Sequence, residues 1–353
     1  MKPVMKQSVC LDCYRQSLFL GQMTIEDAVR EIGSIKGVTG INATTEMLLA
    51  DYPDVTDAFL AQWQALLAET KLAPVTLGSY IDRLQFRDHI MTVAETADAL
   101  RRDLRIAAKL GFENLRIMHD LPLEAVEAVL PLAEELNVCL LDELMPPGTI
   151  LPRAGRKGMD CQNDLDLIAR TGTKHFGLLV NLGLFQQQPN PTQILDVLLK
   201  TRTLQESRAC NANIMAAFHS LEFPDFEIWM NKSFPELTGN RELFQRMFGV
   251  RLFGHSVVPS DLSHIGPQIR DVYAKFIRIF PEACLQNRWE EPSIPYEEVV
   301  RALDDAGYDG YLASLRMNYP TLSLGKNRSD QDIAEEERDQ VRRHQKMLAD
   351  LLA

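Results

Sequence analysis

Eight short apolar runs rich in β-forming residues recur along this chain, and the intervals between them are long enough to hold helices. The runs cover residues 9–11, 38–41, 74–80, 115–118, 138–141, 176–180, 272–277 and 310–313. Their apolar residues are continuous, which is typical of strands that are buried on both faces of a parallel sheet. Strands alternating with helices eight times predict a (β/α)8 TIM barrel. A doubly wound open sheet is the competing fold, but no glycine-rich phosphate turn follows the first run.

The intervals carry helix signals. Thr92 followed by Glu95 is a capping box, and the apolar stripe after it ends at Gly111. Thr24 opens a similar amphipathic pattern, and residues 296–307 repeat the design. These patterns predict helices that cover the outside of the barrel.

One interval is too long for a single crossover helix. Residues from about 191 to 268 carry many aromatic residues, which indicates packed helices over the barrel mouth or against a partner. Residues 331–353 predict a charged C-terminal helix with a narrow apolar stripe that docks on the barrel or on a neighbouring subunit. We therefore predict one TIM-barrel domain over residues 1–330, a helical, aromatic-rich insertion between strands 6 and 7, and a C-terminal helix.

Composition excludes several classes of partner. The formal charge of −12 argues against non-specific nucleic-acid binding, which needs a cationic surface. No run of about 18 apolar residues predicts a membrane span, and no apolar segment follows the N-terminal lysines as in a secretion signal. Scattered cysteines without such a signal favour a reducing cytoplasm, where we expect the protein to reside.

Four positions near the ends of predicted strands are the candidate functional residues. They are Glu143, Asn181, Tyr273 and Leu315, within the phrases CLLDELMPP, GLLVNLGLF, VYAKF and YDGYLASLR. In a TIM barrel the C-terminal ends of the strands carry the functional groups.

These phrases resemble those of xylose-isomerase-like barrels in the sugar isomerase/epimerase superfamily, and are most similar to the α subunits of bacterial C-glycoside deglycosidases. The resemblance extends from about Cys10 to Tyr311. It implies a Glu, Asp, His and Glu set that holds Mn²⁺ or Mg²⁺, which polarises substrate oxygens while a base moves a proton. It also implies a small carbohydrate-like ligand and a β-rich partner subunit.

The chain departs from this ligand set at three of four positions. Asn181 is a neutral amide, Tyr273 is a phenol that stays protonated near neutral pH, and Leu315 cannot coordinate a metal. Glu143 is the only retained family ligand, so we expect no cofactor. Mn²⁺ or Mg²⁺ is expected only if replacement ligands exist, for which the candidates are His119, His219, His255, His264 and Glu143.

Two groups of residues are candidates for roles in this altered site. Glu143, Lys275 and Tyr273 are the candidate catalytic residues. His119, Asn181 and Arg316 are the candidate substrate-binding residues. For Glu143, a structural ion pair with Arg316 is an equal alternative, whereas for a buried Lys275 a structural salt bridge is favoured over a catalytic amine.

Three hypotheses follow. The first in rank is a non-catalytic or sugar-ligand-binding paralogue or subunit, with a mouth filled by apolar side chains. The second is a metal-independent isomerase, epimerase or lyase that acts on a sugar, polyol or glycoside by proton transfer. The third is a metal isomerase with replaced ligands. A homo-oligomer or a partner subunit is compatible with each of them.

Overall fold

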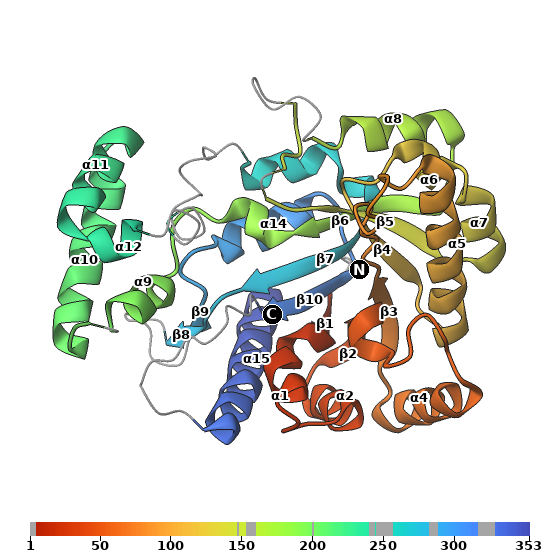
Figure 1. Ribbon diagram of the computed structural model, residues 1–353, viewed down its shortest axis with the longest axis horizontal. Helices are drawn as coiled ribbons and strands as arrows, with labels where there is room; N and C mark the ends of the chain where they lie inside the picture. The colour runs from red at the N-terminus through yellow and green to blue at the C-terminus, as the bar shows by residue number, and fades with distance from the viewer. Residues whose placement is uncertain are drawn as a thin grey trace.

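Eight parallel strands form a closed barrel in the computed structural model of the chain, in the order β1-β10-β7-β6-β5-β4-β3-β2 (Figure 1). The structure describes residues 5–146, 148–152, 160–199, 201–239, 244, 257–281, 289–316 and 329–353. The barrel strands are β1 (Lys6–Cys10), β2 (Val38–Thr44), β3 (Ala73–Gly78), β4 (Asn114–Met118), β5 (Cys139–Leu144), β6 (Phe176–Asn181), β7 (Ile269–Phe276) and β10 (Tyr311–Arg316). The predicted TIM barrel is confirmed, and each predicted run contains part of one strand.

Helices surround the strands. Outside the segment between β6 and β7, the helices between the barrel strands are α1 (Arg15–Phe19), α2 (Ile25–Ser34), α3 (Thr45–Leu48), α4 (Asp57–Thr70), α5 (Val93–Leu110), α6 (Leu123–Glu127), α7 (Leu130–Leu136), α8 (Gln162–Thr171) and α14 (Tyr296–Asp305). The predicted caps are present: Thr92 and Glu95 form a reciprocal capping box, and Gly111 ends α5 with a φ of 82°. In the described ranges, no helix is long and apolar enough to cross a membrane.

Two apolar regions hold the barrel together. The larger one packs the outward faces of the strands against the surrounding helices. The smaller one fills the barrel interior with Leu141, Leu179, Tyr273 and Ala313. Because successive side chains of a strand point to opposite faces, Glu143 shares the interior face of β5 with Leu141, and its neighbour Asp142 points toward the helices.

The segment between β6 and β7 forms a helical lobe in its described part. It contains α9 (Pro191–Leu198), α10 (Leu204–Ser220), α11 (Phe223–Ser233) and α12 (Pro235–Thr238), at the left of Figure 1. Its buried apolar side chains, among them Phe218, Phe226 and Phe234, form a cluster of their own. In the described residues these aromatic side chains therefore pack on one another as the core of the insertion. That these helices cover the barrel mouth or a partner stays a prediction.

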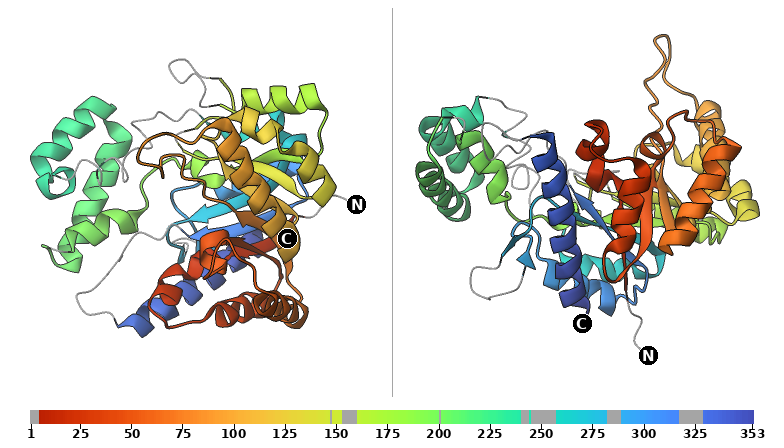
Figure 2. Two further views of the ribbon diagram at one scale, coloured as in Figure 1. Left: turned by 45° about the vertical axis from the view of Figure 1, so that its right-hand side comes forward. Right: turned by 90° about the horizontal axis from the view of Figure 1, so that it is seen from below.

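The C-terminal helix α15 (Asp330–Leu352) lies against β1 and β10 (Figure 2). Gln345 donates to the carbonyl of Ser8 and to Ser314 Oγ, both at 2.7 Å. His344 is fully buried, stacks on Phe276 and makes hydrogen bonds through both ring nitrogens. These buried polar contacts dock the helix in one register on the barrel.

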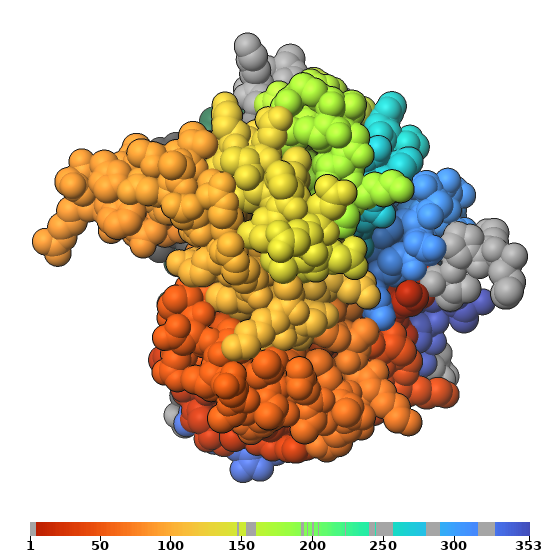
Figure 3. Space-filling model, turned by 90° about the vertical axis from the view of Figure 1, so that its right-hand side faces the viewer, coloured from red at the N-terminus to blue at the C-terminus, as the bar shows by residue number. Residues whose placement is uncertain are grey.

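Residues 79–92, between β3 and α5, form an arm that projects from the barrel (Figure 3, orange). The right-hand view of Figure 2 shows the same projection from another direction. Leu84 is 70% exposed and Ile90 is 59% exposed, and Phe86 also faces solvent. The arm thus presents large apolar side chains to solvent.

Candidate functional site

Glu143 and Asn181 meet inside the barrel, near the C-terminal ends of neighbouring strands. β5 and β6 pair in parallel, and Asn181 Nδ2 donates to Glu143 Oε1 at 2.7 Å. The amide oxygen of Asn181 accepts from the backbone N–H of Gly183 at 3.0 Å, which caps the short turn after β6. Both side chains are buried. An aspartate at 181 cannot donate to Glu143 when it is ionised, so the amide suits a site in which the two groups contact each other directly.

A cation lies beside Glu143. Arg116 Nε is 3.4 Å from Glu143 Oε2, which is a close ion pair between two buried side chains. The guanidinium also donates to the carbonyl of Ser79 at 3.3 Å and lies over the ring of Tyr80. Burial alone lowers the pKa of Arg116, but Glu143 together with Tyr273 and Tyr80 outweighs burial, so the pKa is raised and the group stays charged.

Arg116 is absent from the candidates chosen from sequence. A signal was available, because Arg116 is the only charged residue in the run Leu115-Arg116-Ile117-Met118. A charge in a strand buried on both faces needs a partner inside the protein. Sequence alone does not say which partner that is.

Tyr273 and Leu315 occupy the other two positions of the family-like set. Tyr273 is 2% exposed, and its hydroxyl has no hydrogen-bond partner. Burial raises its pKa well above the usual value, although the nearby Arg116 charge acts in the opposite direction. The phenol is therefore neutral at physiological pH. Leu315 packs at the edge of the interior apolar cluster.

Lys275 lies two residues beyond Tyr273 on β7 and faces the same side. A Cβ built on Gly183 would lie 3.2 Å from Lys275 Cδ, so the aliphatic stem of the lysine runs along this glycine. Burial lowers the pKa of Lys275, and the charge of Glu143 only partly offsets that effect. Its amine therefore loses its proton more readily than an exposed lysine does.

The donor set at these positions fits a divalent ion poorly. One carboxylate is present, and its two oxygens already face Asn181 and Arg116. Tyr273 offers a protonated phenol and Leu315 offers no donor atom. Hard divalent ions in proteins are held by several oxygen ligands. In this chain, the positive charge next to Glu143 is a guanidinium.

Comparisons with known proteins show which sequences and folds this chain is similar to. No family model matches the chain. It is 25% identical over 306 residues to the 3'-dehydrocarminate deglycosidase alpha subunit of Microbacterium sp., covering 83% of this chain and 82% of that protein. It is 24% identical over 317 residues to a C-glycoside deglycosidase alpha subunit of Arthrobacter globiformis, covering 87% and 83%. A crystal structure of D-psicose 3-epimerase in the presence of D-fructose shares the fold with a TM-score of 0.54, at 12% identity and 99% coverage of both chains.

The chain is a (β/α)8 barrel whose sequence is similar to those of C-glycoside deglycosidase alpha subunits and whose fold is shared by D-psicose 3-epimerase. The resemblance seen in the strand-end phrases is thereby confirmed. In this barrel, Glu143, Asn181, Tyr273 and Lys275 lie on the interior face of their strands.

Arg316 does not join this group, and the expected pairing with Glu143 is wrong. Its guanidinium donates to Glu336 Oε1 at 2.9 Å, and Glu336 belongs to α15. Alternation along β10 explains the difference: Leu315 faces the barrel interior, so Arg316 faces the helices outside. Our expectation that Arg316 binds substrate has no support from this placement.

His119 is also separate from the barrel interior. Its ring contacts Asp142, whose side chain points outward from β5. The expected contact of His119 with a ligand in the barrel mouth does not fit this orientation. Among the alternative metal ligands, His219 and His264 form no metal-binding group within the described residues, and His255 lies outside them.

Proposed function

We propose that this chain is a non-catalytic, sugar-ligand-binding relative of the deglycosidase alpha subunits that works without the family's metal ion. The observation that carries the proposal is the buried pair of Arg116 and Glu143. The guanidinium neutralises the remaining family carboxylate, and Asn181 occupies its second oxygen. A general base must be free to take a proton from its substrate, and Glu143 is not free.

The interior of the barrel supports the same proposal. Tyr273 and Leu315 replace two polar metal ligands with a neutral phenol and an apolar side chain beside Leu141 and Leu179. The mouth is thus less charged than a metal-dependent site. Uncharged hydroxyl groups of a sugar suit such a surface, because they need hydrogen bonds and not charge compensation.

The alternative is metal-independent proton transfer, and Lys275 is the observation in its favour. The lowered pKa of its amine is what a general base near neutral pH requires. Lys275 would remove a proton next to a carbonyl of a keto sugar and return it to the other face or the neighbouring carbon. Tyr273, with its unpartnered hydroxyl, would donate a hydrogen bond to the developing oxyanion.

A partner chain is part of the proposal. The curated relatives are named as alpha subunits, and the arm of residues 79–92 exposes Leu84, Phe86 and Ile90. Exposed apolar side chains on a projecting segment are typical of protein–protein contacts. We propose that the arm contacts a second copy of the chain or a partner subunit.

One experiment separates these functions. Purified protein is incubated in D2O with keto sugars and C-glycosides, with and without Mn²⁺, and products and deuterium incorporation are followed by NMR. We expect ligand-dependent chemical shifts without turnover or incorporation. Deuterium incorporation that persists in EDTA and is lost in Lys275→Met would establish the enzyme alternative. Turnover that requires Mn²⁺ and is lost in Glu143→Gln would contradict both.

A further inference from the structure

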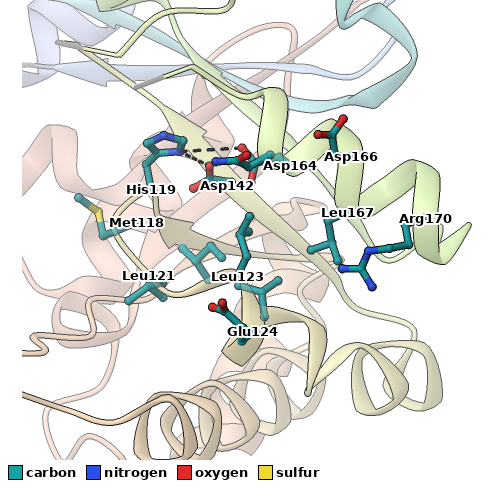
Figure 4. Close-up of a pocket in the computed structure, with 13 residues that line it drawn as sticks. Met118, His119, Leu121, Leu123, Glu124, Asp142, Asp164, Asp166, Leu167 and Arg170 are labelled. Carbon is teal, nitrogen blue, oxygen red and sulfur yellow. Dashed lines mark hydrogen bonds and ion pairs between the residues drawn. The ribbon is translucent and has the colours of Figure 1, made fainter. Parts of the chain in front are cut away.

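A second polar group lies on the outer side of the barrel, away from the Arg116–Glu143 pair. His119 directly follows β4, Asp142 points outward from β5, and Asp164 lies in the first turn of α8. Figure 4 shows their side chains converging at one end of a pocket, whereas Glu124 and Arg170 lie at the other end. Three separate elements therefore bring one imidazole and two carboxylates together.

The spacing of these groups suits a single ion. One nitrogen or oxygen from each residue lies within 4.8 Å of the others. His119 Nδ1 contacts Asp142 Oδ2 directly and lies 4.0 Å from Asp164 Oδ2. Atoms bound to one Zn²⁺ lie about 2.0–2.2 Å from the metal.

The carboxylates are incompletely satisfied by the protein. Asp142 is 3% exposed and Asp164 is 2% exposed, yet Asp142 Oδ1 and Asp164 Oδ2 have no hydrogen-bond donor. Asp160 adds a third negative charge nearby, and His119 is the cation that faces them. Buried carboxylates in proteins are paired or coordinate metals. The unpartnered oxygens thus point to a ligand that the protein itself does not supply.

The pocket leaves room for the remaining coordination positions. It has a volume of about 480 Å³, and its walls include Ile117, Leu121 and Leu167. Three protein ligands with an open fourth position are typical of zinc sites that keep a water or another small ligand. We propose that His119, Asp142 and Asp164 bind one divalent transition-metal ion of the Zn²⁺ class, with its open position facing this pocket.

Protons occupy the group when the metal is absent. The hydrogen bond to Asp142 raises the pKa of His119 to about 9, and burial together with Asp142 raises the pKa of Asp164 to about 8. Metal ligands must be deprotonated, so binding releases protons and weakens as the pH falls. The competing account is a proton-sharing group with no metal, in which the same charges are balanced by protons alone.

Calorimetric titration of Zn²⁺ into tag-free, EDTA-treated protein at pH 7.5 tests the proposal. We expect one site in the wild type, with proton release measured by repeating the titration in buffers of different ionisation enthalpy. Asp164→Asn is expected to weaken binding at least tenfold. His119→Gln, at a partly exposed position, gives a second variant if Asp164→Asn does not fold. Mg²⁺ is expected to bind weakly, because it does not favour an imidazole ligand.

Two matched controls locate the ion. Asp166→Asn changes a carboxylate on the same helix that lines the same pocket outside the group, and is expected to leave Zn²⁺ affinity unchanged. Glu143→Gln, inside the barrel, is likewise expected to leave Zn²⁺ affinity unchanged.

Absence of Zn²⁺ binding in the wild type would overturn this inference alone and would not affect the proposal of a metal-free barrel interior. Equal binding by wild type and both ligand variants would also overturn it. Loss of binding in Glu143→Gln would instead place the metal in the barrel and contradict both proposals.

Discussion

Arg116 and Glu143 form an ion pair inside the barrel, with 3.4 Å between Nε and Oε2. Both residues are at least nine-tenths buried. In related proteins the resemblance implies a metal ion next to this carboxylate. The guanidinium supplies a positive charge in the same neighbourhood, and it is covalently part of the chain. Under the proposed function, this ion pair makes the stability of the site independent of metal concentration.

The first prediction concerns the strength of this pair. Arg116→Met is expected to lower the free energy of unfolding by about 3–5 kcal/mol, because it leaves Glu143 buried without a cation. Glu143→Gln is also expected to be destabilising, because it leaves Arg116 buried without an anion. The double variant is expected to be more stable than the sum of the single effects predicts. Urea denaturation of the four proteins measures this coupling. Strictly additive effects would mean that the two side chains do not stabilise each other.

The second prediction concerns reconstruction of the family's ligand set. Asn181→Asp, Tyr273→His and Leu315→Glu together restore the donors that the resemblance implies. With Arg116→Met added, Mn²⁺ is expected to stabilise the protein, by about 2.7 kcal/mol at a hundred times its Kd. With Arg116 retained, the stabilisation is expected to be smaller, because the guanidinium competes for Glu143.

Thermal denaturation with increasing Mn²⁺ measures this difference. The matched control carries Leu315→Gln in place of Leu315→Glu, which keeps the size of the side chain and removes its charge. Equal Mn²⁺ stabilisation with and without Arg116 would show that the guanidinium does not take the place of the ion.

The third prediction is a pH dependence set by His344, which joins α15 to the barrel. Burial lowers its pKa to about 3, well below the value of about 6.5 for an unfolded chain. A lowered pKa gives stability that is present above pH 6.5 and is lost as the pH falls toward 3. Between pH 7 and 4.5 the contribution of this residue is expected to fall by about 2–3 kcal/mol. Comparing the free energy of unfolding of the wild type and His344→Gln at each pH isolates the contribution of His344. A constant difference between the two proteins would rule out this role.

The fourth prediction concerns the arm of residues 79–92. Leu84→Asp with Ile90→Asp places charges on its exposed apolar side chains. If the arm joins two copies of the chain, sedimentation velocity is expected to show an oligomer for the wild type and a monomer for this variant. Phe19→Asp, at a side chain that is 90% exposed on α1, is the control and is expected to leave the oligomer intact. A wild-type monomer at high concentration, or an oligomer that survives both arm substitutions, would exclude self-association through the arm.

Much of the fold can be predicted from local patterns in the sequence. The apolar runs and the capping residues Thr24 and Thr92 act over a few residues, so their outcome depends little on the remainder of the chain. The meeting of Glu143 with Asn181 was also predictable, because parallel strands end at the same edge of a barrel. Strand alternation was a further available signal, since an inward Leu315 implies an outward Arg316.

The remaining contacts of the site depend on distances that no local pattern encodes. Arg116 reaches Glu143 only because β4 and β5 are neighbours in the barrel, with Met118 opposite Glu143. His119, Asp142 and Asp164 come from the turn after β4, from β5 and from α8, and their spacing is set by how these elements pack.

The amino-acid sequence by itself determined the barrel and its helices, because those properties follow from residue identity and short-range periodicity. Only the tertiary structure decided which charges neutralise one another. Electrostatic pairing depends on through-space distance and burial, and these exist only once the chain has closed into a barrel. For that reason the partner of Glu143 is Arg116, the partner of Arg316 is Glu336, and the imidazole of His119 lies beside two carboxylates outside the barrel.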